Sequence, residues 1–325
     1  MKHPSNHQKY ASLLTNKQAG YVCAALAVLI WSGFILVSRQ GGISALTAYD
    51  VIAIRYSVCS LILFPLWLVY RFKLWQPKLI ISSLVGALLY ALFAFNGFES
   101  TPASHSAVLL PGLMPIAISL MSIPLLGSQI PKQKWLGLSI ITLGVLLLFW
   151  QAWQTTDTQT GLQLGHGFIL AAGLCWALYS VLLSKWHITP WQATVSLALI
   201  TFCLYMPIYL LWLPSEISFQ QLTPALWQEI ALQAVYQGIL ATIIQMLLYV
   251  RAVQTIGAQS MGAMMALVPI LAGLAATVIF NEPLTPLLAT AFITVSFGVW
   301  VTNQAHLIFN RTLWTKEPQH AVRKH

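Results

Sequence analysis

The sequence predicts an all-α membrane protein with ten transmembrane helices, arranged as two inverted five-helix repeats around a central cavity. The first observation is composition: 58% of the 325 residues are hydrophobic and only 7% are charged, whereas soluble domains carry about 25% charged residues. The second is that apolar runs long enough to cross a hydrocarbon core of about 30 Å recur along the whole chain. The third is a sequence relation between the two halves.

Ten apolar runs have the length of a membrane span. They cover residues 20–38, 46–70, 79–98, 103–126, 134–150, 165–185, 190–213, 228–250, 257–281 and 284–306. The first run lacks a clear cleavage site and is followed by nine more, so we expect it to remain as an anchor. Around the spans we expect an N-terminal segment (1–19), a linker (151–164) and a basic tail (307–325).

The charged residues predict the orientation of the spans. With ten spans and a cytoplasmic N-terminus, 14 of the 16 lysines and arginines fall on the cytoplasmic face. Cytoplasmic loops of membrane proteins are enriched in these residues. We therefore expect a multi-pass protein of a bacterial inner membrane with both termini in the cytoplasm. The net charge of +9 is then a topology signal, and we expect no nucleic-acid partner.

The two halves of the chain are related. Gly20 and Trp31 in "GYVCAALAVLIW" align with Gly165 and Trp176 in "GHGFILAAGLCW". A later ungapped register aligns Thr101, Ser106, Leu113, Pro115, Gly144 and Val145 with Thr255, Ser260, Leu267, Pro269, Gly298 and Val299. Each half holds five spans, and because five is odd the halves cross the membrane in opposite directions. Inverted repeats place a site near the bilayer midplane that opens alternately to either face.

The two halves resemble EamA domains of the drug/metabolite transporter superfamily. The resemblance lies in "LIWSGFILVSR", "VIAIRYSVCSLILFP", "SAVLLPGLMPIAISLMSIPLLG" and "WLGLSIITLGVLLL" in the first half, and in "CWALYSVLLSKW", "MALVPILAGLAATVIFNEPLT" and "SFGVWV" in the second. It implies a helical bundle with a central cavity that exports or exchanges small organic metabolites. Ser128 stands where the family usually has an acid, while Glu282 keeps it. This difference argues against a mechanism that needs two carboxylates.

Arg55 is a charged residue well inside the second span, where a charge costs about 2.5–3.5 kcal/mol. Two interpretations stay open: a structural anchor paired with Asp50 or with helix carbonyls, or a cation that faces the substrate. Glu282 lies at the end of the ninth span directly before Pro283. Since the residue before a proline is biased away from helix, we expect Glu282 to fix the turn into the tenth span.

Further binding residues are expected among the aromatic, amide and other polar side chains of the spans, because polar groups in spans usually face protein or water. With Arg55, the predicted set is Trp31, Tyr90, Asn96, His105, Ser106, Trp176, Tyr179, Gln237, Gln245, Tyr249 and Met264. Each single aromatic residue could equally be a core or lipid-facing residue. We expect His105 to be the only embedded histidine, able to titrate near neutral pH.

Prolines and glycines within spans predict hinges and close contacts. Pro111, Pro115 and Pro269 remove backbone donors and leave carbonyls without helical partners, so we expect them to line the cavity or act as hinges. Gly137 and Gly144 lie seven residues apart on one face of the fifth span. This spacing indicates close helix packing.

The main alternatives to a transporter are an intramembrane enzyme and a channel. The sequence lacks zinc-protease, nucleophile-elbow and phosphate-loop motifs, and it lacks charged rings or a carbonyl filter. We expect no catalysis, no cofactor and no metal site. We expect an exporter or exchanger of a small neutral or zwitterionic molecule, such as an amino acid, a purine-like or an aromatic compound. Proton coupling and the choice between monomer and homodimer stay open, and the lipid bilayer is the other expected partner.

Overall fold

The computed structural model describes residues 6–155, 163–217 and 223–310, and these residues form helices joined by loops, without a strand. Ten helical segments are long and apolar enough to cross a membrane. The predicted all-α fold of ten spans in two five-helix repeats is therefore confirmed. Residues 1–5, most of the expected linker and the tail from 311 onward lie outside the described residues.

Each repeat contains five spans, some of them built from more than one helical segment. The first repeat contains α1 (Asn6–Gly42), α2 (Ala48–Val69), a third span made of α3 (Pro77–Ser83), the π-helix η1 (Leu84–Leu89) and α4 (Tyr90–Ser100), then α5 (Ala103–Leu126) and α6 (Lys132–Gln154). The second repeat contains α7 (Leu164–Lys185), α8 (Pro190–Trp212), an eighth span made of α9 (Pro224–Gln233), the π-helix η2 (Ala234–Ile244) and α10 (Gln245–Ile256), a ninth made of α11 (Ala258–Met265) and α12 (Val268–Ile279), and α13 (Pro286–Asn310).

The helix bounds differ from the predicted spans where polar residues continue a helix beyond the apolar run. Helix α1 begins at Asn6, although its apolar part begins at Lys17. The eighth span runs over Pro224–Ile256, which is longer at both ends than the predicted 228–250. Hydropathy locates the part of a helix that can lie in hydrocarbon, whereas the helix itself ends where its backbone is capped.

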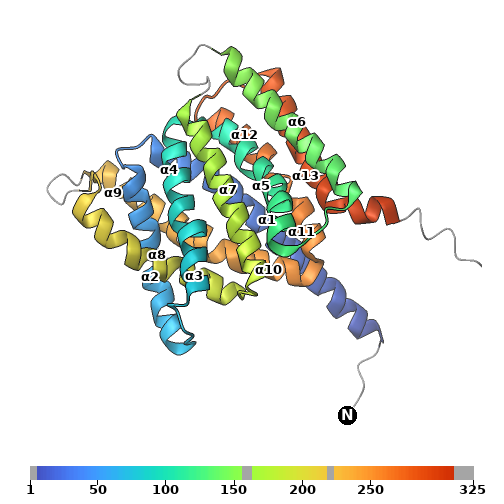
Figure 1. The fold of residues 1–325 in the computed structure, drawn as a ribbon, viewed down its shortest axis with the longest axis horizontal. Helices are drawn as coiled ribbons and strands as arrows, with labels where there is room; N and C mark the ends of the chain where they lie inside the picture. The colour runs from blue at the N-terminus through green and yellow to red at the C-terminus, as the bar shows by residue number, and fades with distance from the viewer. Residues whose placement is uncertain (1–5, 156–162, 218–222, 311–325) are drawn as a thin grey trace, which may run out of the picture.

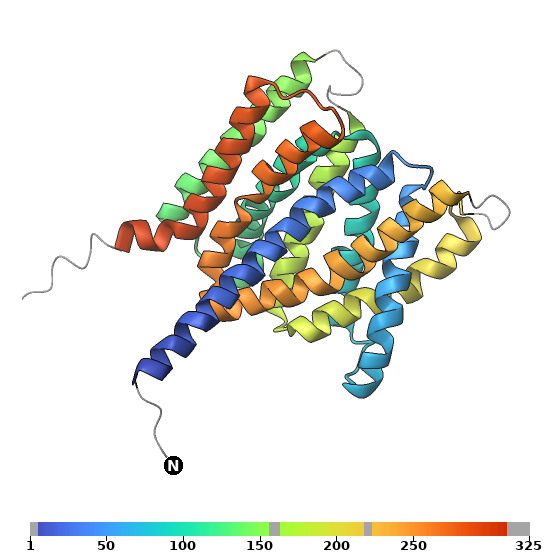
Figure 2. The same ribbon diagram turned by 180° about the vertical axis from the view of Figure 1, so that it is seen from behind.

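The two repeats interlock through equivalent contacts. Helix α1 packs on α10 and η2, and its repeat partner α7 packs on α4 and η1. Helices α2 and α8 contact each other, as do α5 and α12. Helices α6 and α13 lie side by side along one edge of the bundle (Figures 1 and 2). The interface between the repeats thus runs through the middle of the molecule.

Three spans depart from regular α-helix close to the repeat interface. The π-helices η1 and η2 lie in the third and eighth spans, which occupy equivalent positions in the two repeats. The ninth span is interrupted at Ala266 and Leu267, directly before Pro269. By contrast, α5 continues as one helix through Pro111 and Pro115. Of the two spans with predicted hinge prolines, only the ninth is interrupted.

Charges divide the bundle into two ends. The acidic end is the end where α1 terminates, and it carries Asp50, Glu99, Glu216, Glu229 and Glu282. The basic end is the opposite one, and it carries Arg71, Lys73, Lys78, Lys132, Lys134, Lys185 and Arg251. Successive spans alternate in direction, so the loops at one end share the same side of the bilayer.

Hydrogen bonds between the repeats gather at the acidic end and in mid-bundle. The Asp50 carboxylate, in the first repeat, accepts from the Tyr209 hydroxyl at 2.6 Å, from the Ser215 hydroxyl at 2.7 Å and from the Glu216 backbone N–H at 3.1 Å. Asp50 also forms the capping box of α2 with Thr47. The expected pairing of Arg55 with Asp50 is therefore wrong, because loop and cap donors occupy this carboxylate.

Glu282 joins the two repeats at the same end. Its two carboxylate oxygens accept from the backbone N–H groups of Ala103 at 2.7 Å and Ser104 at 2.8 Å. These N–H groups open α5 and have no partner within that helix, and a negative charge is favourable at a helix N-terminus. The turn before α13 forms as expected, but the carboxylate itself caps a helix of the other repeat. Sequence proximity to Pro283 could not indicate this partner.

The α6–α13 contact predicts opposite effects for two glycine-to-alanine changes. A Cβ at Gly137 would lie 2.6 Å from the backbone nitrogen of Thr302, whereas a Cβ at Gly167 would meet nothing within 4 Å. Overpacking costs about 1–3 kcal/mol, while alanine in a helix is favoured over glycine by roughly 0.5–1 kcal/mol. Gly137→Ala should lower the melting temperature in detergent, and Gly167→Ala should leave it unchanged or raise it. Equal shifts for the two variants would contradict the close contact.

The inter-repeat cap predicts that Glu282→Ala destabilises the protein. Loss of a side-chain cap costs about 0.5–2 kcal/mol, and here two N–H groups lose a charged partner. Glu282→Gln should destabilise the protein less than Glu282→Ala, because the glutamine amide oxygen can still accept a hydrogen bond. The matched control is Glu216→Ala, since the Glu216 side chain is exposed at the same end. Thermal unfolding in detergent measures the difference, and similar melting temperatures for Glu282→Ala and Glu216→Ala would contradict the cap.

Candidate functional site

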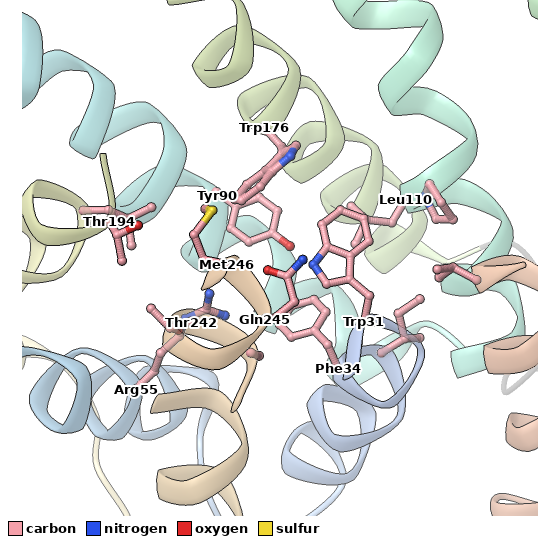
Figure 3. Close-up of a pocket in the computed structure, with 15 residues that line it drawn as sticks. Trp31, Phe34, Arg55, Tyr90, Leu110, Trp176, Thr194, Thr242, Gln245 and Met246 are labelled. Atoms are coloured by element: carbon pink, nitrogen blue, oxygen red, sulfur yellow. The ribbon is translucent and has the colours of Figure 1, made fainter. Parts of the chain in front are cut away.

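A pocket lies in mid-bundle between the two repeats (Figure 3). The first repeat lines it from α1, α2, α4 and α5, and the second from α7, α8, η2, α10 and α12. Its labelled lining residues are Trp31, Phe34, Arg55, Tyr90, Leu110, Trp176, Thr194, Thr242, Gln245 and Met246. The two edge helices α6 and α13 contribute no residue to this lining. The position agrees with the midplane site that inverted repeats predict.

Aromatic side chains form one wall of the pocket. The repeat-related Trp31 and Trp176 meet edge to face, with ring centroids 6.2 Å apart. The ring centroid of Tyr90 lies 5.2 Å from that of Trp176, and the ring centroid of Tyr179 lies 5.4 Å from it. Such a cluster offers flat apolar faces and polar edges to an aromatic or aliphatic group.

Arg55 brings a positive charge into this pocket. Its side chain is 6% exposed, and its guanidinium carbon lies 5.5 Å from the ring centroid of Phe34, 5.8 Å from that of Tyr56 and 6.0 Å from that of Phe95. Its one hydrogen bond, from Nη1 to the Gln237 side-chain oxygen, is long at 3.4 Å, and its Nε has no partner. Arg55 forms no ion pair with any carboxylate of the described residues.

The charge on Arg55 is only partly compensated. Desolvating an ion costs several kcal/mol unless a partner repays it, and cation–π contacts supply about 0.5–2 kcal/mol each. Arginine carries five N–H donors, and just one of them is used here. The site is therefore complementary to a group that brings negative charge and hydrogen-bond acceptors.

Gln245 and Thr242 add polar groups opposite the aromatic wall. The Gln245 side chain is 6% exposed and forms no hydrogen bond with the described part of the chain. Thr242 donates from its hydroxyl to the Gln237 carbonyl at 2.6 Å, across the wider turn of η2. The same π-helix thus carries the amide that contacts Arg55 and a wall of the pocket. Gln245 remains available to a bound molecule.

The free space in the pocket is small in this conformation. The centre of a water-sized molecule can move within about 40 Å³. Pockets that hold a small organic molecule usually have volumes of roughly 300–1,000 Å³, so this space is small for a metabolite. Binding of a metabolite therefore requires the walls to move apart.

The structure brings about half of the predicted binding residues together. Trp31, Arg55, Tyr90, Trp176 and Gln245 line the pocket, and so does the predicted hinge residue Pro111. Two further predicted residues contact this set without lining the pocket: Tyr179 contacts Trp176, and Gln237 contacts Arg55. The remaining predicted binding residues, which do not line the pocket, are Asn96, His105, Ser106, Tyr249 and Met264.

These five residues have other neighbours. The Asn96 amide donates to the Leu92 carbonyl of its own helix at 2.7 Å. Tyr249 and Met264 pack on a small cluster that includes Ala24 and Met261, between α1, α10 and α11. Ser106 is fully buried, with a hydroxyl that has no partner.

His105 contacts His166, which is itself 1% exposed. The expectation that His105 is the only embedded histidine is therefore wrong. His166 lies at the start of α7, and the packing of α7 on α5 buries it.

Several lining residues were missed by the sequence analysis. Phe34 lies three residues after Trp31, and Thr242 lies three residues before Gln245. Residues three or four apart share a helix face, so this periodicity could have found both. Thr194 and Met246 carry no comparable signal, because only tertiary packing brings their helices to the pocket.

The comparisons with known proteins agree with this architecture. A model of the EamA-like transporter family matches residues 18–150 and 163–304, one match in each repeat. The chain belongs to this family. A transporter is generally not an enzyme, and the membership supports a multi-pass protein that moves small molecules across a lipid bilayer.

Two individual proteins are similar to this family member. The "Uncharacterized transporter YyaM" of Bacillus subtilis (strain 168) is 23% identical over 193 residues, which are 59% of this chain and 61% of the relative. The match thus spans less than two thirds of the relative's length. A solved structure titled "Crystal structure of protein" has a TM-score of 0.58 and 18% identity, covering 91% of this chain and 99% of that chain. The similarity to this solved structure shows the fold alone.

Proposed function

We propose that this EamA-like transporter moves a small neutral or zwitterionic amphipathic metabolite by alternating access, as an exporter or exchanger. The observation that carries the proposal is the unpaired Arg55 beside the aromatic wall, at the interface of two inverted repeats. In a bound state, an apolar ring would lie against Trp31 and Trp176, and a carboxylate or carbonyl group would accept from Arg55. Amino acids, purine-like metabolites and small aromatic compounds have this chemistry.

The charge of the pocket limits the choice of substrate. One arginine cannot balance a multiply charged anion such as a nucleotide sugar, and no carboxylate among the lining residues could balance a polycation. A zwitterion needs one cation for its carboxylate and acceptors or ring faces for its ammonium group. Gln245 and the tryptophan faces supply these. This balance favours a zwitterion with an aromatic side chain over a neutral compound.

Alternating access is supported by the small cavity and by the helix irregularities next to it. The π-helix η2 and the lining residue Val268, which follows the interruption of the ninth span, border the pocket. Irregular backbone is tolerated in membranes where it lines a cavity. We assign hinge roles to three prolines. Pro111 lines the pocket, Pro115 lies one turn beyond it on the same helix, and Pro269 lies in the ninth span.

Counterflow into proteoliposomes tests the transport proposal. Vesicles loaded with an aromatic amino acid, a purine or a nucleotide sugar should be offered the same radiolabelled compound outside. We expect saturable counterflow of a neutral or zwitterionic compound, which neither an enzyme nor an open pore produces. Robust transport of a multiply charged anion, with neutral and zwitterionic compounds ignored, would overturn the substrate class.

The role of Arg55 predicts a transport defect that exceeds any loss of protein. Removing one partner of a buried charged contact costs about 2–5 kcal/mol, so Arg55→Ala should lower counterflow at least about tenfold. Counterflow by Arg55→Lys should lie between that of the wild type and that of Arg55→Ala, because an ammonium lacks the planar fork of a guanidinium. Arg71→Ala is the matched control, since Arg71 is exposed at the basic end. Normal counterflow in Arg55→Ala would exclude Arg55 from substrate binding.

The charge asymmetry of the two ends predicts their sidedness. We assign the basic end to the cytoplasm and the acidic end to the outside of a bacterial inner membrane. In a variant without Cys23, Cys59, Cys175 and Cys203, single cysteines at Ile43 and Trp75 would probe the two ends, because both side chains are at least half exposed. An impermeant maleimide should label position 43 in intact cells and position 75 only after lysis. The reverse pattern would contradict the orientation.

A further inference from the structure

A pair of buried histidines joins the two repeats near the acidic end. His105 lies in the first turn of α5, in the first repeat, and His166 lies in the first turn of α7, in the second. Their side chains are 2% and 1% exposed. Nδ1 of His105 lies 2.9 Å from Nε2 of His166, and the ring planes are 52° apart. Neither ring lines the pocket, so the proposed substrate site leaves this contact unexplained.

The backbone of Gln163 gives the pair two neutral arrangements. In one, the Gln163 N–H donates to His166 Nδ1 at 3.1 Å, and His166 Nε2–H donates to His105 Nδ1. In the other, His166 Nδ1–H donates to the Gln163 carbonyl at 3.2 Å, and His105 Nδ1–H donates to His166 Nε2. One further proton on His166 would leave both of its N–H groups with acceptors. A proton can therefore be taken up while the ring–ring hydrogen bond is kept, with the bond at His166 Nδ1 changing from the Gln163 N–H to the Gln163 carbonyl.

The charged groups around the pair are already engaged. Glu282, in the loop before α13, binds the N–H groups of Ala103 and Ser104, in the same turn as His105. Beyond it, Arg39 donates from Nη1 to the Phe98 and Glu99 carbonyls. The Glu99 carboxylate accepts from the backbone N–H of Ala48. The neighbour of His166 on α6 is the ring of Phe149. No carboxylate of the described residues forms a direct contact with either histidine.

We propose that the His105–His166 pair is a proton-binding site shared by the two repeats, and that proton uptake there opens the acidic end. A movement of the repeats apart at this end separates the two rings and lets water reach them. Free imidazole gains a proton near pH 6.5, while a proton added to the closed pair places a cation among buried groups. Acid therefore favours the separated rings. The inference rests on the alternating movement proposed above, but its test needs no substrate.

Distances between spin labels at the acidic end test the proposal. In the full chain without its four native cysteines, labels would be placed at Ile43 and Leu284, which are exposed and belong to different repeats. The distance distribution would be measured in nanodiscs from pH 5 to pH 8.5. We expect the ratio of the long-distance to the short-distance population to be at least about fivefold higher at pH 5.5 than at pH 8. A distribution independent of pH would overturn the proposal.

The double variant His105→Asn with His166→Gln should remove this response. Asparagine places its amide near the position of Nδ1, and glutamine near that of Nε2, so a hydrogen bond can persist without a titrating ring. His187→Asn is the matched control, because His187 is exposed near the basic end with a φ of 49° that asparagine tolerates. It should keep the wild-type response.

Two further results separate the histidine pair from other groups. Glu282→Gln should retain the pH response, and a response lost there but kept in the double histidine variant would assign proton binding to Glu282 and overturn the proposal. If the double variant does not fold, His105→Asn alone decides, because it removes one of the two rings. Its population ratio should change less over the same pH range than that of the wild type, because only one ring is left to gain a proton, and an undiminished response would overturn the proposal. Counterflow is independent of this result, so failure of transport and failure of the proton site are distinguishable.

Discussion

Water cannot satisfy a polar group inside hydrocarbon, and this constraint decides where the few polar side chains of the chain lie. Carboxylates occur at the acidic end, where Asp50 and Glu282 receive backbone N–H and hydroxyl groups from the opposite repeat. In mid-bundle the polar side chains face the pocket or one another. The repeats are thus joined by polar contacts at the acidic end and by further hydrogen bonds in mid-bundle, such as those of Gln237 with Arg55 and Ser38.

Asp50 and Arg55 are both charged and buried, but Arg55 has far fewer partners among the described residues than Asp50 has. Three aromatic faces and one long hydrogen bond surround a guanidinium with an unused Nε. Replacement by an apolar residue would remove the desolvation cost, and the substrate proposed above would supply the partner that Arg55 lacks among the described residues. The pocket is also small for that substrate in the present conformation. The binding site and the conformational change are therefore linked by the same residues.

Opening of the bundle must break the contacts between the repeats at the acidic end. The Glu282 cap, the Asp50 cluster and the histidine pair all lie there, and each joins one repeat to the other. The π-helix η2 lies between this end and the pocket, whereas η1 and the interruption before Pro269 lie on the basic side of the lining residues. A proton at the histidine pair would act at the point where separation of the repeats begins.

Composition and repeat symmetry were sufficient to predict the ten spans and the inverted repeats, because hydrocarbon thickness and chain direction leave few alternatives. They also identified Trp31 and Trp176 as repeat partners, but only the structure shows that the two rings meet. Helix periodicity could also have indicated Phe34 and Thr242. Only the tertiary structure decided that Glu282 caps α5, that His166 is buried against His105, and that Arg55 has no carboxylate partner in the part of the chain that the structure describes. Each of these depends on a contact between residues distant in sequence, and local pattern records which side chains are polar but not which partner satisfies them.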